Sequence, residues 1–168
     1  MSAQVTQIVN AMITQLQGWA DLSYVTTFSR SGDLMDLIKR GKYPFIDIEV
    51  DNRKSGQAGN QRLYDYVRHE YNVVVRFCLA YPDKEVVMNG QFPDPEDPED
   101  ETPVRKGLWD MAEDIEAAID SDLSFSGTVK NNAVIPTIMV DSFYYQEGLV
   151  WVGRGAMIFS VTKDIAKR

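Results

Sequence analysis

Two carboxylates in the segment PFIDIEV are the residues of this sequence best placed to do chemistry. Asp47 and Glu49 are two positions apart in a short apolar segment that predicts a strand, so both side chains lie on one face. Carboxylates in such pairs hold Mg²⁺ during phosphodiester cleavage, and Lys54 follows nearby. The alternative is that both residues have no catalytic role and simply lie on the solvent-exposed face of an edge strand.

The residues that follow weaken the magnesium hypothesis. The pattern resembles metal-dependent nucleases in which strand carboxylates precede an E-x-K element, but Val50 and Asp51 follow Glu49 here. The sequence also lacks G-x-S-x-G, Walker A, the dinucleotide glycine fingerprint and H-E-x-x-H. A magnesium-dependent nuclease using Asp47 and Glu49 is therefore kept only as an alternative. No catalytic residue, cofactor or metal site is predicted.

The single cysteine and the single histidine do not form a simple catalytic pair. Cys78 and His69 are nine residues apart in one predicted strand, and an odd separation places them on opposite faces. One cysteine excludes an internal disulfide and a thiolate zinc site, and it favours folding in the cytosol. His69 is expected to pack as a neutral side chain beside Tyr71 and Val67.

Length, charge and hydropathy exclude further classes. The 168 residues predict a single domain, 1–168, and an apolar fraction of 44% supplies a buried core. The formal net charge of −8 argues against a general DNA- or RNA-binding surface, which needs clustered Lys and Arg. No apolar run approaches the ~20 residues that span a bilayer. The first residues carry no secretory signal pattern.

The stretch 62–81, RLYDYVRHEYNVVVRFCLAY, is the element around which the chain is organised. It is rich in Tyr, Val and Phe and lacks Gly and Pro, which predicts a strand. At ~3.3 Å per residue it would span on the order of 60 Å, far more than an ordinary strand. Its half from His69 onward alternates an apolar core face with a wetter face. Such a strand extends past its own sheet and offers a free end to a partner.

A half-buried strand over 45–50 precedes this stretch, and the polar, glycine-containing segment 51–61 joins the two as a loop. Together they predict an antiparallel hairpin with a long, mobile and locally basic tip. The candidates for contact with a neighbouring subunit or partner lie at this tip and at the start of the return strand. They are Arg53, Lys54, Arg62, Tyr64, Tyr66 and Arg68.

Two amphipathic helices are predicted to cover one face of the sheet. The first spans 3–17 and ends at Gly18, and a short helical turn over 33–40 is capped by Ser31 or Asp33. The second helix starts with Thr102 as N-cap and Pro103 at its first position. Its apolar stripe is Val104, Leu108, Met111, Ile115, Ala118 and Ile119. The acidic, proline-rich segment 93–103 before it predicts a disordered or extended loop.

The last part of the chain predicts a second hairpin. Its strands are 134–145 and 149–162, and Gly153 with Gly155 predicts a bulge or a strong twist in the second. A short strand near 24–28 stays ambiguous. The order α-β-β-α-β-β therefore predicts an α+β domain with an antiparallel sheet of about four strands, two helices on one face and a long protruding hairpin.

This order resembles the tail terminator, or tail completion, proteins of long-tailed bacteriophages and related head–tail neck proteins. The segments that carry the resemblance are SAQVTQIVNAMITQL, YPFIDIEVDN, RHEYNVVVRFCLAY, GLWDMAEDIEAAI and RGAMIFSVTK. It covers nearly the full length as a likeness of order and pattern, and the acidic insert 93–103 is not part of it.

The resemblance implies a structural virion protein of the tail or neck, assembled in the host cytoplasm. It implies a homo-oligomeric ring, commonly a hexamer, that caps the tail tube and joins it to a neck or head-completion protein. DNA would pass through the lumen without specific binding, and the acidic surface would make that lumen negative. No catalysis, cofactor or membrane is implied. A head-completion or adaptor protein of the same neck shares these features and stays open as an alternative.

Overall fold

A five-stranded sheet forms the centre of the molecule, with the strand order β1-β2-β3-β5-β4. The computed structural model describes residues 3–30, 32–55, 66–91, 104–129 and 137–166. The strands are β1 (Thr27–Arg30), β2 (Phe45–Ser55), β3 (Tyr66–Tyr81), β4 (Thr137–Tyr145) and β5 (Val150–Ala166). The helices in these ranges are α1 (Ala3–Gly18), the 3-10 helix η1 (Ala20–Leu22), α2 (Leu34–Lys39), α3 (Lys84–Asn89) and α4 (Leu108–Asp120). The predicted α+β class is confirmed.

The sheet is mixed, with one strand more than predicted. β1 pairs parallel with β2, from Thr27 opposite Phe45 to Arg30 opposite Ile48, whereas the other three pairings are antiparallel. The prediction of about four strands, all antiparallel, was therefore wrong. The ambiguous segment near 24–28 overlaps the additional strand, β1, only at its last two residues, because β1 spans Thr27–Arg30. Four residues are too few to give a clear alternation in the sequence.

The first long hairpin contains more strand than predicted. Residues 51–55 were predicted to begin the loop, but they belong to β2, because β3 pairs with them as far as Ser55 opposite His69. The register shifts between Val50 and Asn52, which lie opposite Val73 and Asn72, so Asp51 is an additional residue in β2. The rest of the predicted loop, 56–61, and the acidic segment 93–103 lie outside the described residues.

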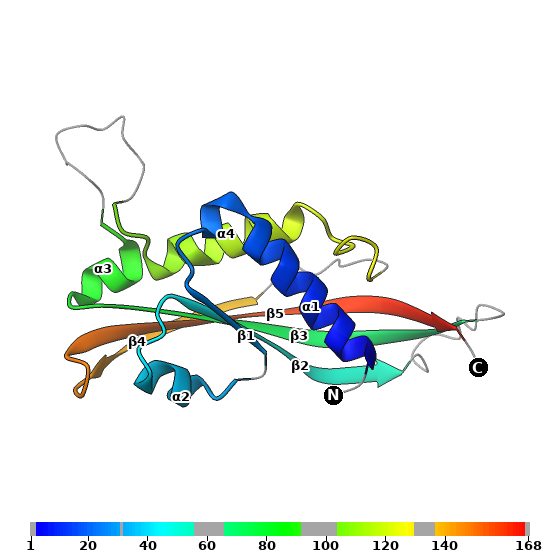
Figure 1. Cartoon of the computed structure of the whole chain (residues 1–168), viewed down its shortest axis with the longest axis horizontal. Coiled ribbons are helices and arrows are strands. Elements are labelled where there is room, and N and C mark those ends of the chain that lie inside the picture. The colour runs from blue at the N-terminus through cyan, green and yellow to red at the C-terminus, as the bar shows by residue number, and fades with distance from the viewer. Residues whose placement is uncertain (1–2, 31, 56–65, 92–103, 130–136, 167–168) are drawn as a thin grey trace.

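Helices cover the two faces of the sheet unequally (Figure 1). Of the helices in the described ranges, α1, α3 and α4 lie on one face, and only the short helix α2 lies on the other. The predicted core face of β3 is confirmed on the first side, where alternate residues are fully buried against α1 and α4. These residues are Tyr71, Val73, Val75, Phe77 and Leu79. The two helices predicted from the sequence, now α1 and α4, do share this face.

α2 buries a small second cluster on the opposite face, which was not predicted. Its buried members are Ile38, Phe45, Cys78 and Val152. Asp33 is the N-cap, since its carboxylate accepts bonds from the backbone N–H of Met35 at 2.9 Å and Asp36 at 3.4 Å. Burial raises the pKa of the Cys78 thiol, so this cysteine is a packing residue and not a nucleophile.

α4 begins later than predicted, because Gly107 and not Thr102 precedes its first turn. The Gly107 N–H donates to the Asp110 carboxylate at 2.7 Å, and a Cβ on Gly107 would lie 2.1 Å from the Gly90 nitrogen. That close approach to the end of α3 requires glycine. Val104 is 64% exposed and does not belong to the apolar stripe. Thr102 and Pro103 lie outside the described residues.

The glycines of β5 allow close packing and do not form a bulge. The register between β3 and β5 runs without a shift from Tyr66 opposite Ala166 to Tyr81 opposite Trp151. Phe77 lies opposite Gly155, and a Cβ on Gly155 would lie 2.2 Å from the end of the Phe77 ring. Of the two predicted alternatives, a bulge or a strong twist, the bulge is therefore wrong, and Gly155 leaves the space that this ring fills.

We expect Gly155→Ala to lower the free energy of unfolding by about 1–3 kcal/mol, because the buried Phe77 ring must move. Urea unfolding of both proteins measures the change. Gly18→Ala is the matched control, since a Cβ there meets nothing within 4 Å, and its effect should stay within about 0.5 kcal/mol. Equal effects of the two substitutions would contradict the packing role of Gly155.

Candidate subunit-contact surface

Among the described residues, α2 covers only part of its side of the sheet. We call the rest of this side the open sheet face; it comprises the side chains of Asp47, Glu49, Arg68, Glu70, Asn72, Val74, Arg76, Met139, Asp141, Arg154, Ala156, Ile158, Ser160, Thr162 and Asp164. Its apolar part includes Met139 and Ile158, which are 55% and 38% exposed. Large apolar side chains on an uncovered sheet indicate a contact surface.

Each arginine on the open sheet face is bound to a carboxylate. Arg154 makes two bonds to Asp141, at 2.9 and 2.5 Å, and Arg68 bonds Asp164 at 2.8 Å. Arg76 lies between these pairs and bonds two carboxylates of β2. These arginines are therefore already neutralised, and among the described residues the face presents no row of unpaired cations of the kind that a phosphate backbone requires.

Asp47 is fully buried and connects three segments. Its Oδ1 accepts a bond from the Ser29 hydroxyl at 2.5 Å and from the Gly32 N–H at 2.8 Å, and its Oδ2 accepts one from Arg76 at 2.7 Å. The interpretation of Asp47 as a solvent-facing residue of an edge strand is wrong, because β1 pairs outside β2 and covers it. The carboxylate attaches β1 to the sheet.

The same geometry opposes the magnesium hypothesis. A guanidinium nitrogen of Arg76 lies 2.7 Å from Asp47 and 2.6 Å from Glu49, so a cationic side chain already bridges the two carboxylates. Among the described residues, no three or more His, Cys, Asp or Glu side chains are grouped to hold a metal ion. Asp47 and Glu49 both form ion pairs with Arg76. Both oxygens of Asp47 accept hydrogen bonds, so neither is free to bind a metal.

The predicted contact residues lie along the far end of β2 and β3. Arg53 and Lys54 belong to β2 and Tyr66 opens β3, whereas Arg62 and Tyr64 lie outside the described residues. Only the side chain of Arg68 can be described, and it points onto the open sheet face toward Asp164 of β5. Asp164 lies beyond the predicted end of the last strand at residue 162, so this pair was not predicted.

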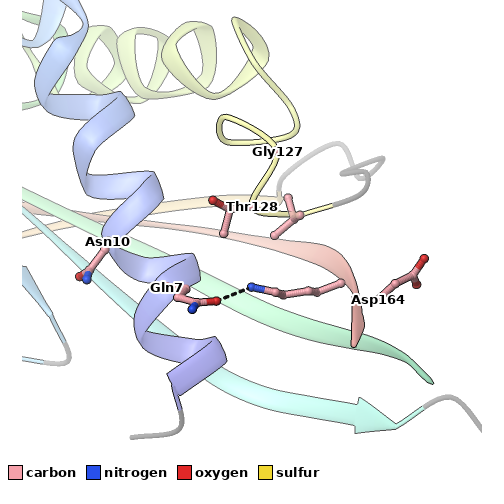
Figure 2. Close-up of a pocket in the computed structure, with 7 residues that line it drawn as sticks. Gln7, Asn10, Gly127, Thr128 and Asp164 are labelled. Carbon is pink, nitrogen blue, oxygen red and sulfur yellow. Dashed lines mark hydrogen bonds between the residues drawn. The ribbon is translucent and has the colours of Figure 1, made fainter. Parts of the chain in front are cut away.

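A cleft of about 650 Å³ lies where the end of β5 passes α1 (Figure 2). Lys163 donates to the side-chain oxygen of Gln7 at 2.7 Å across it, and burial lowers the pKa of this lysine. Both charged side chains of the lining already have partners: Lys163 bonds Gln7, and Asp164 bonds Arg68. The bond between Lys163 and Gln7 connects β5 to α1.

The two outer strands leave both edges of the sheet open within the described part of the chain. β4 has nine residues, and its one charged side chain, Asp141, is bound to Arg154. β1 has four residues and lies at the other end of the strand order. Between Thr137 and Tyr145, β4 has no Lys, Pro or bulge, and its single charge is paired, so this edge has little of the usual protection against pairing with another chain.

Comparison with known proteins does not assign this chain to a family. No family model matches the sequence, and no curated protein matches it. Among solved structures, a chain of the virion of a native gene transfer agent particle is similar, with a TM-score of 0.42 and 9% identity. The similarity covers 98% of this chain and 100% of that chain. Similarity at this level assigns neither fold nor function. None of the helices in the described ranges is long and apolar enough to cross a membrane.

We expect Asp47→Asn to destabilise the fold by about 1–3 kcal/mol, because an amide at this buried site cannot accept bonds from all three partners. Chemical denaturation measures the loss. Glu49→Gln is the matched control: it removes the negative charge of the ion pair with the same Arg76, but at a side chain that is 39% exposed, so its cost should stay below about 1 kcal/mol. A larger loss in the control would contradict the role given to Asp47.

Proposed function

We propose that this chain is a structural virion protein that forms a homo-oligomeric ring at the end of a phage tail tube. The observation that carries the proposal is a sheet with two open edges and a largely uncovered face within the described residues. Such a subunit has contact surfaces on opposite sides. Heterologous contacts between opposite sides close into a ring when the rotation between copies is a fraction of a full turn.

The resemblance of the sequence to tail terminator proteins supports the more specific parts of the proposal. The ring would contain six copies, cap the finished tail tube and join it to the neck protein. The contact candidates at the far end of β2 and β3 would reach the tail tube or the neck. Of these candidates, Arg68 has a described side chain, which lies on the open sheet face opposite Asp164 near the end of β5.

The charge of the chain suits a channel for DNA. The net charge of −8 repels the phosphate backbone, and the arginines on the open sheet face are each bound to a carboxylate. DNA would therefore pass through the lumen without binding. A ring whose channel is strongly basic would contradict this part of the proposal.

Native mass spectrometry of the purified protein tests the ring. We expect one assembled species at an integer multiple of 19.0 kDa, with six copies as the predicted number. Incubation with isolated tail tubes should yield tubes capped at one end in electron micrographs. A monomer at every concentration, with no assembly on tail tubes, would contradict the proposal. Binding to capsids with a portal in place of tail tubes would identify a head-completion protein instead.

A further inference from the structure

We propose that β4 of one subunit pairs antiparallel with β1 of the next, so that one continuous sheet runs around the assembly. This inference rests on the proposed ring and names the contact that builds it. The occupant of the open β4 edge is thus a second copy of this chain. β1 and β4 are the two ends of the strand order, so a head-to-tail contact uses both edges at once.

Strand directions within the sheet favour this pairing. β1 runs parallel to β2, and the three antiparallel pairings that follow make β4 run opposite to β1. A rotation about an axis roughly along the strands preserves their direction. It therefore brings β1 of the next copy beside β4 in the antiparallel sense. Antiparallel pairing is the more stable arrangement per residue, and it needs no crossover.

The buried carboxylate gives β1 the rigidity that such a contact requires. A four-residue strand at a sheet edge is held by few backbone bonds, but Ser29 of β1 and Gly32 after it both donate to Asp47. Arg76 of β3 holds the other oxygen of this carboxylate. β1 is thus connected by side chains to the second and third strands of the sheet, and it stays in place for a partner strand.

Charge also favours a second copy on the β4 edge. Two chains of net charge −8 repel one another, so copies must meet where free carboxylates are few. The carboxylate of β4, Asp141, is bound to Arg154, and the guanidinium of Arg154 also lies 4.9 Å from the ring centre of Phe143. β1 has no acidic residue and ends in the exposed cation Arg30. The two edges can therefore meet without repulsion between like charges.

Disulfide trapping tests the contact in the full-length chain. Thr27→Cys in β1 would be combined in turn with Met139→Cys or Phe143→Cys in β4, since these side chains point to the same face. Antiparallel neighbours lie within disulfide range, and two β4 positions sample different registers. Ile158→Cys is the control, because it is exposed on that face but lies in the inner strand β5. Buried Cys78 does not interfere.

We expect mild oxidation to link subunits covalently in at least one β1–β4 combination and not in the Ile158→Cys control. Links that form between β4 positions of two copies, or equally well with Ile158→Cys, would overturn the inference. A ring of the expected mass without any β1–β4 link would overturn it too and leave the proposed function standing. Absence of any assembly would instead overturn the proposed function.

A second pair of variants tests the edge without cysteines. Met139→Lys places a cation on the β4 edge, and Ile158→Lys places one on the same face of an inner strand. The first should raise the concentration for half-assembly by about tenfold, and the second should leave it within about twofold, with unfolding midpoints confirming that both fold. Equal weakening by the two would indicate docking on the face and would overturn edge pairing.

Discussion

The unbroken antiparallel pairing of β3 with β5 is the constraint on which the rest of the structure depends. It runs over the whole of β3. The side chains of this strand contribute to the core beneath α1 and α4, to the cluster beneath α2, and to the open sheet face through Arg68 and Arg76. Because side chains alternate strictly along a strand, each pair in this ladder determines which side chains meet α1 and α4 and which lie on the side of α2 and the open sheet face. β2 and β4 add to its two sides, and neither continues as far.

A buried charge is the second organising feature. Burying a carboxylate costs free energy unless it is paired and hydrogen-bonded, and Asp47 achieves both by bonding Ser29, Gly32 and Arg76. The result is a short edge strand held firmly in place beside a long one, although few backbone bonds hold it. Asp47, which the sequence suggested as a metal ligand, therefore attaches the edge strand β1 to the sheet. This links local packing to the way in which copies of the chain could assemble.

Sequence patterns predicted the features that arise within one element. The amphipathic pattern of α1 and the alternation from Tyr71 to Leu79 follow from spacing alone, and the structure confirms them. The spacing left Ser31 and Asp33 as possible caps of α2, and the structure shows Asp33 in that role. Features that need two distant segments were missed. β1 is defined by its pairing with β2, the start of α4 by the approach of Gly107 to Gly90, and the burial of Asp47 by the strand that covers it. None of these contacts leaves a periodic signal in the sequence.

Gly155 has a consequence for how the long hairpin finds its partner. The space above this glycine fits the Phe77 ring only when the two residues lie directly opposite one another. A slip of one residue would bring Phe77 against Arg154 or Ala156 and would turn every apolar side chain of one strand to the wrong face. A strand this long and rich in valine has many nearly equivalent pairings. Because Gly155 has no side chain, only one of these pairings accommodates the Phe77 ring, so this glycine specifies the register of β3 with β5 during folding.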